Sequence, residues 1–519
     1  MTELTEDVDG TALVGKQAVR PCGLHERSPG APHAEGMRLA DFHEYLRNEK
    51  TAAKSAEEEW CDPDYETQEG VRDVLAAVRS GAPMVFVSGR AGTGKSRLID
   101  YMKRMPGGNG QVVVAPTGVA ALALKASTIH SFFRLPIGVI DSSAMEPDER
   151  FGAVHRRMRR LVIDEISMVR ADMLDGIDRR LRMLRNPDLP FGGVQVVMVG
   201  DFLQLPPVVT EEDQHLLERL GYDTPFAFSA RVMQKMPIKV ATLKKVWRQS
   251  DPEMIRALGC IREGRDIENA TNWLNERCAR EHREGVIPLL LTATRAAADS
   301  YNTEGLMSLR SKYKDPSAEA IVFTARSGGS FENERAIPPA PRDLELYRGA
   351  RVMSVKNDAA MGYVNGSLGE VLDFDDGAGV FEDAWVSVLF DGQAEPVRIF
   401  PAQWVKTSQA WDAKSEAIVE ETTGVFEQIP LIIGYAITIH KSQGLTLKDV
   451  RIDLGRGAFA PGQLYVALSR AKSVEGLSFV RPIQPRDVQV DEMLIRFLEW
   501  ARGADNLDFA AETAHLPEN

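Results

Sequence analysis

The sequence has no uninterrupted apolar run near the roughly 18 residues that a membrane-spanning helix requires, so we expect no membrane partner. Cysteine is scarce: the four residues are Cys22, Cys61, Cys260 and Cys278, and none forms a CxxC pair. This spacing disfavours a zinc knuckle or a redox pair and is typical of ordinary thiols in a reducing cytoplasm. The opening segment, MTELTEDVDG, is acidic and precedes no apolar segment, so we expect no secretory or transit peptide and a cytoplasmic protein.

Positive charge is also in deficit. Lys and Arg number 62 against 75 Asp and Glu, which gives a net charge of −13 over 519 residues. This balance alone disfavours a nucleic-acid partner, but net charge governs solubility and long-range steering rather than the content of one groove. Acidic residues concentrate at 57–69 and after Asp491. A basic cluster, interpreted as a solvated helix face or alternatively as a nucleic-acid contact, consists of Arg156, Arg157, Arg159 and Arg160.

With 44% hydrophobic and 26% charged residues, the composition is that of a soluble globular protein. The length suggests about three or four domains of roughly 100–200 residues. Changes in texture along the chain predict the boundaries. We expect a mobile leader at 1–60, a first α/β domain at 61–245, a second α/β domain at 246–344 and 406–485, a small β-barrel inserted into it at 345–405, and a C-terminal helix and tail at 486–519.

In the first α/β domain, short apolar runs alternate with helical segments, which is typical of a parallel sheet covered on both faces. A short helix is also expected in the leader, at Arg38–Lys54. The expected strands of the domain are Met84–Ser88, Gln111–Thr117, Leu161–Asp164 and Val194–Gly200, and its expected helices include Ser96–Met105 and Gly118–Lys125.

The second α/β domain begins near Ile287–Thr294, resumes at Leu431–His440 and ends after Leu477–Val480. In the interruption, the segments VNGS, DDGAG and FDGQ mark turns between short apolar runs, a pattern typical of an antiparallel barrel. In the tail, the apolar residues of LIRFLEWARGADNLDF recur at helical spacing. They fit a closing helix or, alternatively, a partner-binding peptide.

The stretch GRAGTGKS fits the phosphate-loop pattern GxxxxGK[ST], follows an apolar run and opens a helical segment. Its glycines let backbone N–H groups close around phosphate oxygens, and the helix N-terminus adds partial positive charge. Lys95 is expected to reach the β- and γ-phosphates, and Ser96 to bind Mg²⁺. The predicted nucleotide-binding residues are Gly89, Arg90, Ala91, Gly92, Thr93, Gly94, Lys95 and Ser96.

The stretch LVIDE is an apolar strand that ends in two carboxylates, at the edge where α/β sheets bind ligands. Asp164 is expected to hold Mg²⁺ together with Ser96, and Glu165 to orient and deprotonate the attacking water. With the phosphate loop, this pair predicts hydrolysis of ATP or GTP.

What the hydrolysis drives is a separate question. A transporter ATPase would carry an LSGGQ-like signature, which this sequence lacks, and a small-molecule kinase would be much shorter. A motor needs a cation on the second α/β domain that responds to the γ-phosphate, and such an arginine is worth about 10³–10⁵ in rate. On spacing alone, Arg470 in QLYVALSRAK is one candidate among many.

Further blocks follow the phosphate loop in a fixed order. Together they resemble the superfamily-one DNA helicases of the PIF/RecD-like branch, as do RGARVMSVKN and NGSLGEV. The resemblance implies two RecA-like P-loop NTPase domains with ATP between them, single-stranded DNA lying across both, and 5′-to-3′ movement. The blocks are APTGVAALALKASTIHSFF, VIDEISMV, VGDFLQLPPV, WRQSD, YAITIHKSQGLTL and YVALSRAKSVEGL.

The resemblance also implies residue roles. Gln204 would sense the γ-phosphate, and Arg248 and Arg470 would reach it from the far side. They complete the catalytic set formed with Lys95, Asp164 and Glu165. The residues placed on or beneath the DNA track are Thr117, His130, Ser131, His440, Lys441 and Ser442.

Some of these positions have a second interpretation. His130 and His440 also fit hydrogen-bonded core histidines, and Gln443 also fits the nucleotide side. Many relatives read adenine with a glutamine before the first strand, but Gln68 lies farther upstream of Gly89 than the family position. Adenine recognition is therefore open. Residues 134–160 correspond to a small insertion that would act as a wedge at the fork, where its arginines would contact phosphates.

We therefore expect an ATP-dependent DNA helicase that uses Mg²⁺, binds single-stranded and forked DNA and is monomeric. One alternative is an RNA or RNA–DNA hybrid helicase, because no motif reports on the 2′-hydroxyl. Another is a translocase that remodels nucleoprotein complexes without unwinding. A projecting element at 134–160 would favour unwinding. The pathway and any protein partners are left open.

Overall fold

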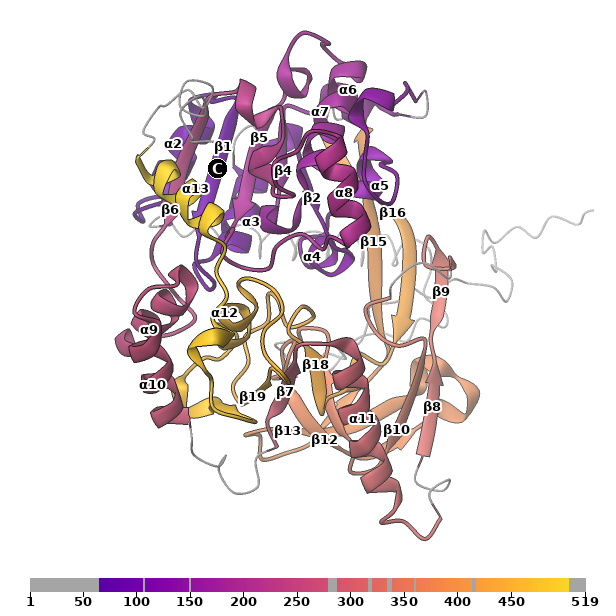
Figure 1. The fold of residues 1–519 in the computed structure, drawn as a ribbon. Coiled ribbons are helices and arrows are strands. Elements are labelled where there is room, and N and C mark those ends of the chain that lie inside the picture. Colours follow the sequence, from indigo (N-terminus) through magenta and orange to yellow (C-terminus); the bar gives the residue numbers. More distant parts are fainter. Residues whose placement is uncertain are drawn as a thin grey trace, which may run out of the picture. The chain divides into compact units, whose positions relative to one another are not determined.

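The structure, a computed structural model, describes residues 65–105, 108–148, 151–278, 287–315, 320–333, 338–358, 361–412 and 417–503. The expected leader at 1–60, with its helix at Arg38–Lys54, and the tail beyond residue 503 lie outside these residues. In the described ranges no helix is both long enough and apolar enough to cross a membrane. They form a mixed α/β fold with two parallel sheets, consistent with two RecA-like domains (Figure 1).

The part that we call the first half is built on a six-stranded sheet in the order β3-β2-β4-β5-β1-β6. Every neighbouring pair in this sheet is parallel. β1 and β2 are buried along their whole length, as expected for strands covered on both faces. The strands are β1 (Met84–Gly89), β2 (Gln111–Ala115), β3 (Ser127–Thr128), β4 (Arg160–Ile163), β5 (Gln195–Gly200) and β6 (Ile238–Leu243).

Alternate residues of these strands enter two different cores. Val85 and Val87 pack with residues of α2 and α3, whereas Met84 and Phe86 pack with residues of α5 and α7. This is the period of two that a strand imposes on its side chains. The helices are α2 (Val71–Arg79), α3 (Lys95–Arg104), α4 (Gly118–Ala123), α5 (Ile129–Phe133), α6 (Ala153–Arg157), α7 (Ala171–Leu184) and α8 (Glu211–Arg219).

The part that we call the second half has a four-stranded parallel sheet in the order β18-β7-β19-β20. Its core also contains Ala91 and Leu205 from the first half, so the two halves are packed together at these loops. The strands are β7 (Leu289–Thr292), β18 (Ala436–Thr438), β19 (Val450–Asp453) and β20 (Leu477–Phe479), and the helices are α9 (Pro252–Glu263), α10 (Ile267–Cys278), α11 (Arg295–Arg310), α12 (Gln463–Leu468) and α13 (Glu492–Gly503).

Between β7 and β18, the chain forms antiparallel sheets with orders β10-β8, β14-β13-β12-β11-β17 and β15-β16-β9. No ladder among the described strands joins β14 to β17, so the closed barrel expected at 345–405 stays a prediction. The strands are β8 (Ala320–Thr324), β9 (Arg326–Gly329), β10 (Asp343–Tyr347), β11 (Arg351–Ser354), β12 (Leu368–Asp375), β13 (Trp385–Phe390), β14 (Val397–Ile399), β15 (Ala402–Asp412), β16 (Ala417–Gln428) and β17 (Leu431–Ile433).

The long strands β15 and β16 rise beside the first half (Figure 1). There β15 contacts β3 and α6, and Ser127 Oγ donates to the carbonyl oxygen of Thr407 at 3.4 Å. Short 3₁₀ helices complete the fold at 108–110, 142–144, 166–168, 190–193, 227–229, 233–235, 377–379, 381–383, 474–476 and 485–487.

The segment Leu431–His440 contains two strands that belong to different sheets. β17 pairs antiparallel with β11, and β18 pairs parallel with β7. Gly434 separates them, and a Cβ there would lie 2.6 Å from the carbonyl carbon of Val352. The chain therefore changes sheet at a position where only glycine fits.

α13 returns from the second half to the core of the first (Figure 1). The Phe497 ring stacks on Phe228, with centroids 4.5 Å apart, and also contacts Phe86 and Phe202. The apolar residues at helical spacing thus form the face that α13 buries.

Candidate active site

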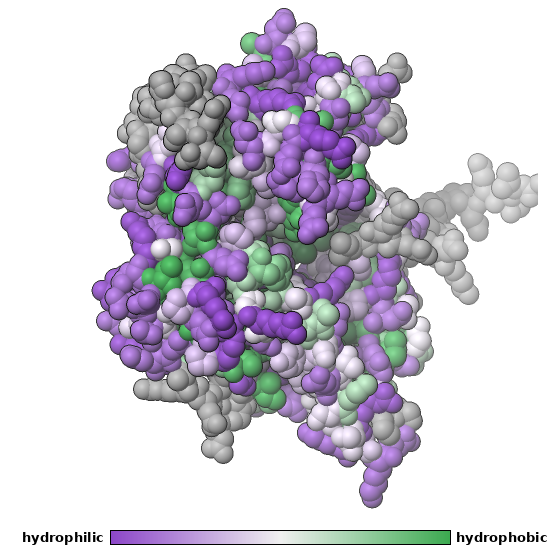
Figure 2. Space-filling model, in the orientation of Figure 1, coloured by the Kyte–Doolittle hydropathy of each residue, from purple (hydrophilic) through white to green (hydrophobic). Residues whose placement is uncertain are grey.

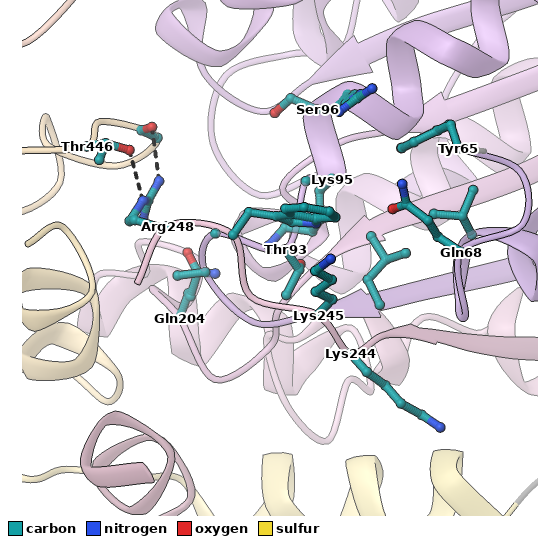
Figure 3. Close-up of a pocket in the computed structure, with 18 of the residues that line it drawn as sticks. Tyr65, Gln68, Thr93, Lys95, Ser96, Gln204, Lys244, Lys245, Arg248 and Thr446 are labelled. Atoms are coloured by element: carbon teal, nitrogen blue, oxygen red, sulfur yellow. Dashed lines mark hydrogen bonds between the residues drawn. The ribbon is translucent and has the colours of Figure 1, made fainter. Parts of the chain in front are cut away.

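A cavity of ≈ 560 Å³ lies between the two halves, within the roughly 300–1,000 Å³ that is usual for small-molecule sites. The first half lines it with the phosphate loop and with residues that follow β4, β5 and β6. The second half adds residues from two loops. Figure 3 shows Lys95 and Ser96 between Arg248 on one side and Tyr65 and Gln68 on the other.

The phosphate loop has the shape that its glycines permit. Gly92 and Gly94 have φ of 76° and 87°, in the left-handed region, and α3 begins directly after them at Lys95. The Lys95 amine donates to the carbonyl oxygens of Gly89, at 2.8 Å, and Arg90, at 3.2 Å. Burial lowers the pKa of Lys95, although carboxylates of neighbouring loops act in the opposite direction. The loop thus places a buried amine beside a helix N-terminus, where an anion is stabilised.

The two carboxylates after β4 differ in their surroundings. Asp164 is buried and does not line the cavity, and burial together with the charge of Glu165 raises its pKa to about 7. Glu165 lines the cavity with φ of 48°, an unusual conformation for a residue other than glycine. Its buried Oε2 has no hydrogen-bond partner among the described residues. This oxygen is therefore an acceptor whose hydrogen-bonding capacity is unused.

Two arginines reach the cavity at its second-half side. Arg248, in the connector after β6, donates to Thr446 Oγ1 at 2.9 Å and to the carbonyl oxygens of Gly444 and Ser469. Arg470, just after α12, is buried and donates to Ser469 Oγ at 2.7 Å. Burial and the like charge of Arg248 lower the pKa of Arg470 to about 9. Both guanidinium groups are cationic at neutral pH, and an anion between them would relieve their repulsion.

The halves touch directly at the tip of the phosphate loop. The backbone N–H of Trp247 donates to the Gly92 carbonyl oxygen at 2.8 Å, and the backbone N–H of Ala91 donates to the Tyr465 hydroxyl at 3.1 Å. A Cβ on Gly92 would lie 2.6 Å from the Cβ of Arg248. Glycine at this position therefore lets the connector approach the phosphate loop.

Gln204 also belongs to the cavity. It is 2% exposed, lines the cavity and follows β5 by a few residues. The structure thus brings together five of the six predicted catalytic residues: Lys95, Glu165, Gln204, Arg248 and Arg470.

Several lining residues were absent from the predicted site. Tyr65 and Gln68 both line the cavity, so the sequence offset of Gln68 does not remove it from the site. Trp247 is half exposed, and the Lys245 amine lies 3.7 Å from its ring centroid. Trp247 precedes Arg248 in the WRQ block, which is the signal that would have indicated it. The other lining residues that were not predicted include Glu69, Lys244, Thr446 and Lys472.

Other predicted residues lie outside the cavity. Of the phosphate loop, Gly89 and Arg90 do not line it, and Arg90 donates to Glu263 of α9. Thr117 caps α4, since its side chain accepts the Ala120 N–H. None of the six residues predicted to lie on or beneath a DNA track lines the cavity. They are Thr117, His130, Ser131, His440, Lys441 and Ser442.

Those DNA-track residues differ in exposure. Ser131 and Lys441 are exposed, whereas Ser442 is fully buried and donates to the Ile439 carbonyl oxygen. Burial lowers the pKa of both His130 and His440. Ser442 can therefore support the track but not contact a ligand on it.

The side chains that line the cavity fit a nucleoside triphosphate. Several cationic side chains line it, among them Lys95, Arg248 and Arg470, together with Glu165, whose Oε2 has no hydrogen-bond partner among the described residues. In the described ranges no group of three or more His, Cys, Asp or Glu side chains is spaced to hold a metal ion. The donor set Ser96 and Asp164 instead fits Mg²⁺, which takes most of its ligands from phosphate and water.

The family model described as PIF1-like helicase matches residues 65–276. The chain is similar to the ATP-dependent DNA helicase PIF1 of Rattus norvegicus, with 35% identity over 450 residues that cover 85% of this chain. It spans 65% of the length of that relative.

Solved structures agree with this match. A crystal structure of Bacteroides sp Pif1 in complex with ADP-AlF4 has a TM-score of 0.74 and 33% identity, over 84% of this chain and 97% of that one. Bacteroides Pif1 bound to ssDNA has a TM-score of 0.60 and 33% identity, over 85% and 98%.

Proposed function

Since the chain belongs to the PIF1-like helicase family, we propose that it is an ATP-dependent DNA helicase that moves along single-stranded DNA and unwinds duplexes. The observation that carries this proposal is one cavity in which Lys95 and Glu165 of the first half meet Arg248 and Arg470 at the second. Cations contributed from a second domain tie hydrolysis to domain closure. The Bacteroides relatives with ADP-AlF4 and with ssDNA support both ligands.

The chemistry follows from the lining residues. The phosphate-loop backbone and Lys95 hold the phosphates of ATP. The free oxygen of Glu165 accepts a proton from the water that attacks the γ-phosphate, and ADP and phosphate are released. Arg248 and Arg470 stabilise the charge that develops on the transferred group. Tyr65, Gln68 and Trp247 surround the remaining space, which suits the base.

Mg²⁺ is proposed at Ser96 and Asp164, where it supplies neutralisation of phosphate charge. The raised pKa of Asp164 reflects burial beside Glu165, a position where a cation is favourable. Ser96 is exposed at the start of α3, so its hydroxyl is accessible from the cavity.

Movement is proposed to run 5′ to 3′ on the strand. Gln204 responds to the γ-phosphate and the second half closes on the first, so that each cycle shifts the grip on DNA. Thr117, His130 and Ser131 of the first half and His440 and Lys441 of the second are the proposed contacts. Backbone contacts dominate such a grip, so binding falls steeply with salt and shows little sequence preference.

The proposed wedge, residues 134–160, contains a loop that hydrogen bonds hold to Arg170 and Asp172. The Gly138 carbonyl oxygen accepts from Arg170, and the Ile140 N–H donates to the buried carboxylate of Asp172 at 2.7 Å. Between Leu135, which is buried, and Gly138 lies Ile137, which is 92% exposed. Hydrophilic residues dominate the face shown in Figure 2, with apolar residues scattered among them. Among the large apolar side chains of the described residues, Ile137 has the largest exposed fraction, and we propose that it packs against a terminal base pair at the fork.

The basic cluster of the wedge divides into two parts. Arg160 donates to Gln195 and Gln111 within the sheet, so it has a structural role. Arg156, Arg157 and Arg159 are exposed and are the proposed phosphate contacts. Changing these three to glutamine should weaken binding to forked DNA, and unaltered fork binding would refute the wedge.

A second candidate is a translocase that remodels nucleoprotein complexes, or a helicase acting on RNA or hybrids. The exposed apolar side chain of Ile137 in the proposed wedge is the observation for which we prefer unwinding over stripping alone. We further propose that the protein is monomeric and cytoplasmic and serves DNA replication, repair or recombination.

The test is strand displacement on forked DNA with either a 5′ or a 3′ single-stranded tail, in Mg²⁺ and ATP. Wild type should unwind only from the 5′ tail, and Lys95→Ala should not unwind. Lys103→Ala is the matched control on α3, since its amine donates to the Leu124 carbonyl oxygen, away from the cavity. DNA-stimulated hydrolysis without displacement from either tail would instead favour the translocase.

A further inference from the structure

Four charged side chains join the two halves just outside the cavity. Asp201 follows β5, Arg262 and Glu263 end α9, and Arg90 belongs to the phosphate loop. Asp201, Arg262 and Glu263 are each less than 9% exposed. The proposed hydrolysis uses none of these four side chains.

The geometry of the group is directional. The Arg262 guanidinium donates from Nε and Nη2 to the Asp201 carboxylate, with a shortest distance of 2.6 Å. Its Nη1 donates to Glu263 Oε1 at 3.1 Å, and Arg90 Nη2 donates to the same oxygen at 3.1 Å. Arg265 also pairs with Glu263. A planar fork bound through two nitrogens fixes orientation as well as distance.

Both ends of this chain of contacts reach loops that line the cavity. Gln204 Nε2 donates to Asp201 Oδ2 at 3.4 Å, and Gln204 lines the cavity. At the other end, Arg90 adjoins Ala91, a lining residue packed in the core of the second half. The group therefore connects the loop of the γ-phosphate sensor with the phosphate loop through the end of α9.

α9 is shaped for this approach. A Cβ on Gly259 would lie 3.0 Å from Arg90 Nη1, so glycine there leaves room for the guanidinium. Met254, Leu258 and Ile261 of α9 pack in the core of the second half. A displacement of α9 is therefore passed to the sheet of that half, because close-packed interiors transmit strain.

Electrostatics shows that the pair is held as ions. Burial alone would raise the pKa of Asp201, but the charge and hydrogen bonds of Arg262 outweigh it and lower the pKa. A buried ion pair is weak evidence of a purely stabilising role, because apolar residues of similar volume stabilise as well or better. What the pair adds is a unique relative orientation of the two elements.

We propose that Arg262 is a positioning residue that couples the nucleotide-sensing loop at 201–205 to α9 and thereby to movement of the second half. It does not line the cavity and takes no part in bond breaking. The inference rests on the proposed function, since it assigns the route by which hydrolysis at that site becomes movement on DNA.

The test compares wild type with Arg262→Lys, which retains the charge but loses the two-nitrogen fork. For each full-length protein, ATP hydrolysis at saturating single-stranded DNA and the translocation rate are measured together, and nucleotides moved per ATP are calculated. Arg262→Lys should reduce this ratio by about fivefold or more, the lower end of typical coupling between sites, with little change in KM for ATP. Arg277→Gln is the matched control, since Arg277 forms an exposed ion pair with Glu253 of α9.

A second arm tests the route through Gln204. In a Gln204→Ala background, adding Arg262→Lys should cause no further loss in the ratio, because residues that act through one another are not additive. If Arg262→Lys fails to fold, Glu263→Ala takes its place, since it removes the acceptor of Arg90 while keeping the Asp201–Arg262 pair.

The outcomes separate the two proposals. Wild-type translocation is read first, because its absence refutes the proposed function and this inference with it. Another outcome is that wild type moves while Arg262→Lys lowers hydrolysis and movement in proportion, with nucleotides moved per ATP at the wild-type value. In that case Arg262 has only a structural role and the proposed coupling is refuted. A fall in the ratio that persists undiminished in the Gln204→Ala background would also overturn the stated route.

Discussion

The two halves of the molecule build their share of the cavity in different ways. In the first half, the phosphate loop, Glu165 and Gln204 follow directly from β1, β4 and β5 of one parallel sheet. At the second half, Arg470 follows a short helix, and Arg248 lies in the connector that leads from β6 of the first sheet into the second half. Strand ends of a single sheet are placed by local geometry, whereas the arginines depend on how the halves pack.

The largest effect is expected when the arginine that the second half contributes to the cavity is removed. Arg470→Ala should reduce DNA-stimulated ATP hydrolysis by about 10³–10⁵, because it removes a cation that stabilises the transition state from the far side. Binding of a fluorescent ATP analogue should change much less. Arg456→Ala, an exposed arginine of the same half, should hydrolyse ATP at the wild-type rate. A loss below tenfold for Arg470→Ala would mean that the first half alone completes the site.

The corresponding change in the first half is Glu165→Gln. It should lower hydrolysis by about 10²–10⁴, the usual contribution of a general base, while nucleotide binding is retained. Steady-state kinetics and equilibrium binding on the same preparation separate the two. Glu211→Gln, on the exposed N-terminus of α8, should match wild type. Equal loss of binding and hydrolysis would instead give Glu165 a structural role.

α13 belongs to neither half alone, because it follows the second half in the chain and packs in the core of the first. Phe497→Ala should reduce the free energy of unfolding by about 3–5 kcal/mol, because it opens a cavity among Phe86, Phe202 and Phe228. Urea unfolding measures this change. Met493→Ala, on the exposed side of α13, should cost much less. Similar midpoints for the two variants would show that α13 does not fasten the halves.

The smallest effect, when taken per pH unit, concerns acid. Burial lowers the pKa of His155 to about 4 from 6.5, so the unfolded chain binds the proton more readily. The stabilisation is therefore complete above pH 6.5 and is lost as the pH falls toward 4, by about 1.4 kcal/mol per pH unit. His155→Gln should flatten this slope in the unfolding free energy, and His215→Gln, exposed on α8, should not. An unchanged slope in His155→Gln would show that other groups cause it.

Sequence reasoning reached the first half's site more fully than the second's. The phosphate loop and Glu165 were predicted from spacing because each motif is contiguous and follows an apolar strand. Arg248 and Arg470 could be assigned only through the resemblance, since an arginine outside a strand end carries no local signal. For Gln68, spacing along the chain was a poor guide. It lies farther upstream than the family position, yet it lines the cavity.

The same contrast holds for the fold. Short apolar runs predicted β1, β2, β4 and β5 of the first sheet but not β3 or β6. The strand expected at Gln111–Thr117 ends earlier, as β2 at Ala115, because Thr117 caps α4. The expected barrel was not confirmed, because turn residues indicate antiparallel pairing but not which edges meet. β15 and β16 extend well beyond 405 and lie beside the first half, which no local pattern indicated.

The sequence by itself indicated a nucleotide site and identified the family, because contiguous residues encode a phosphate loop and a strand ending in carboxylates. Only the tertiary structure decided which distant charges meet. Asp201 and Arg262 are 61 positions apart, and each alone is an ordinary charged residue. Their pairing follows from two cores packed against each other, since a buried charge in that interface is stable only where an opposite charge faces it.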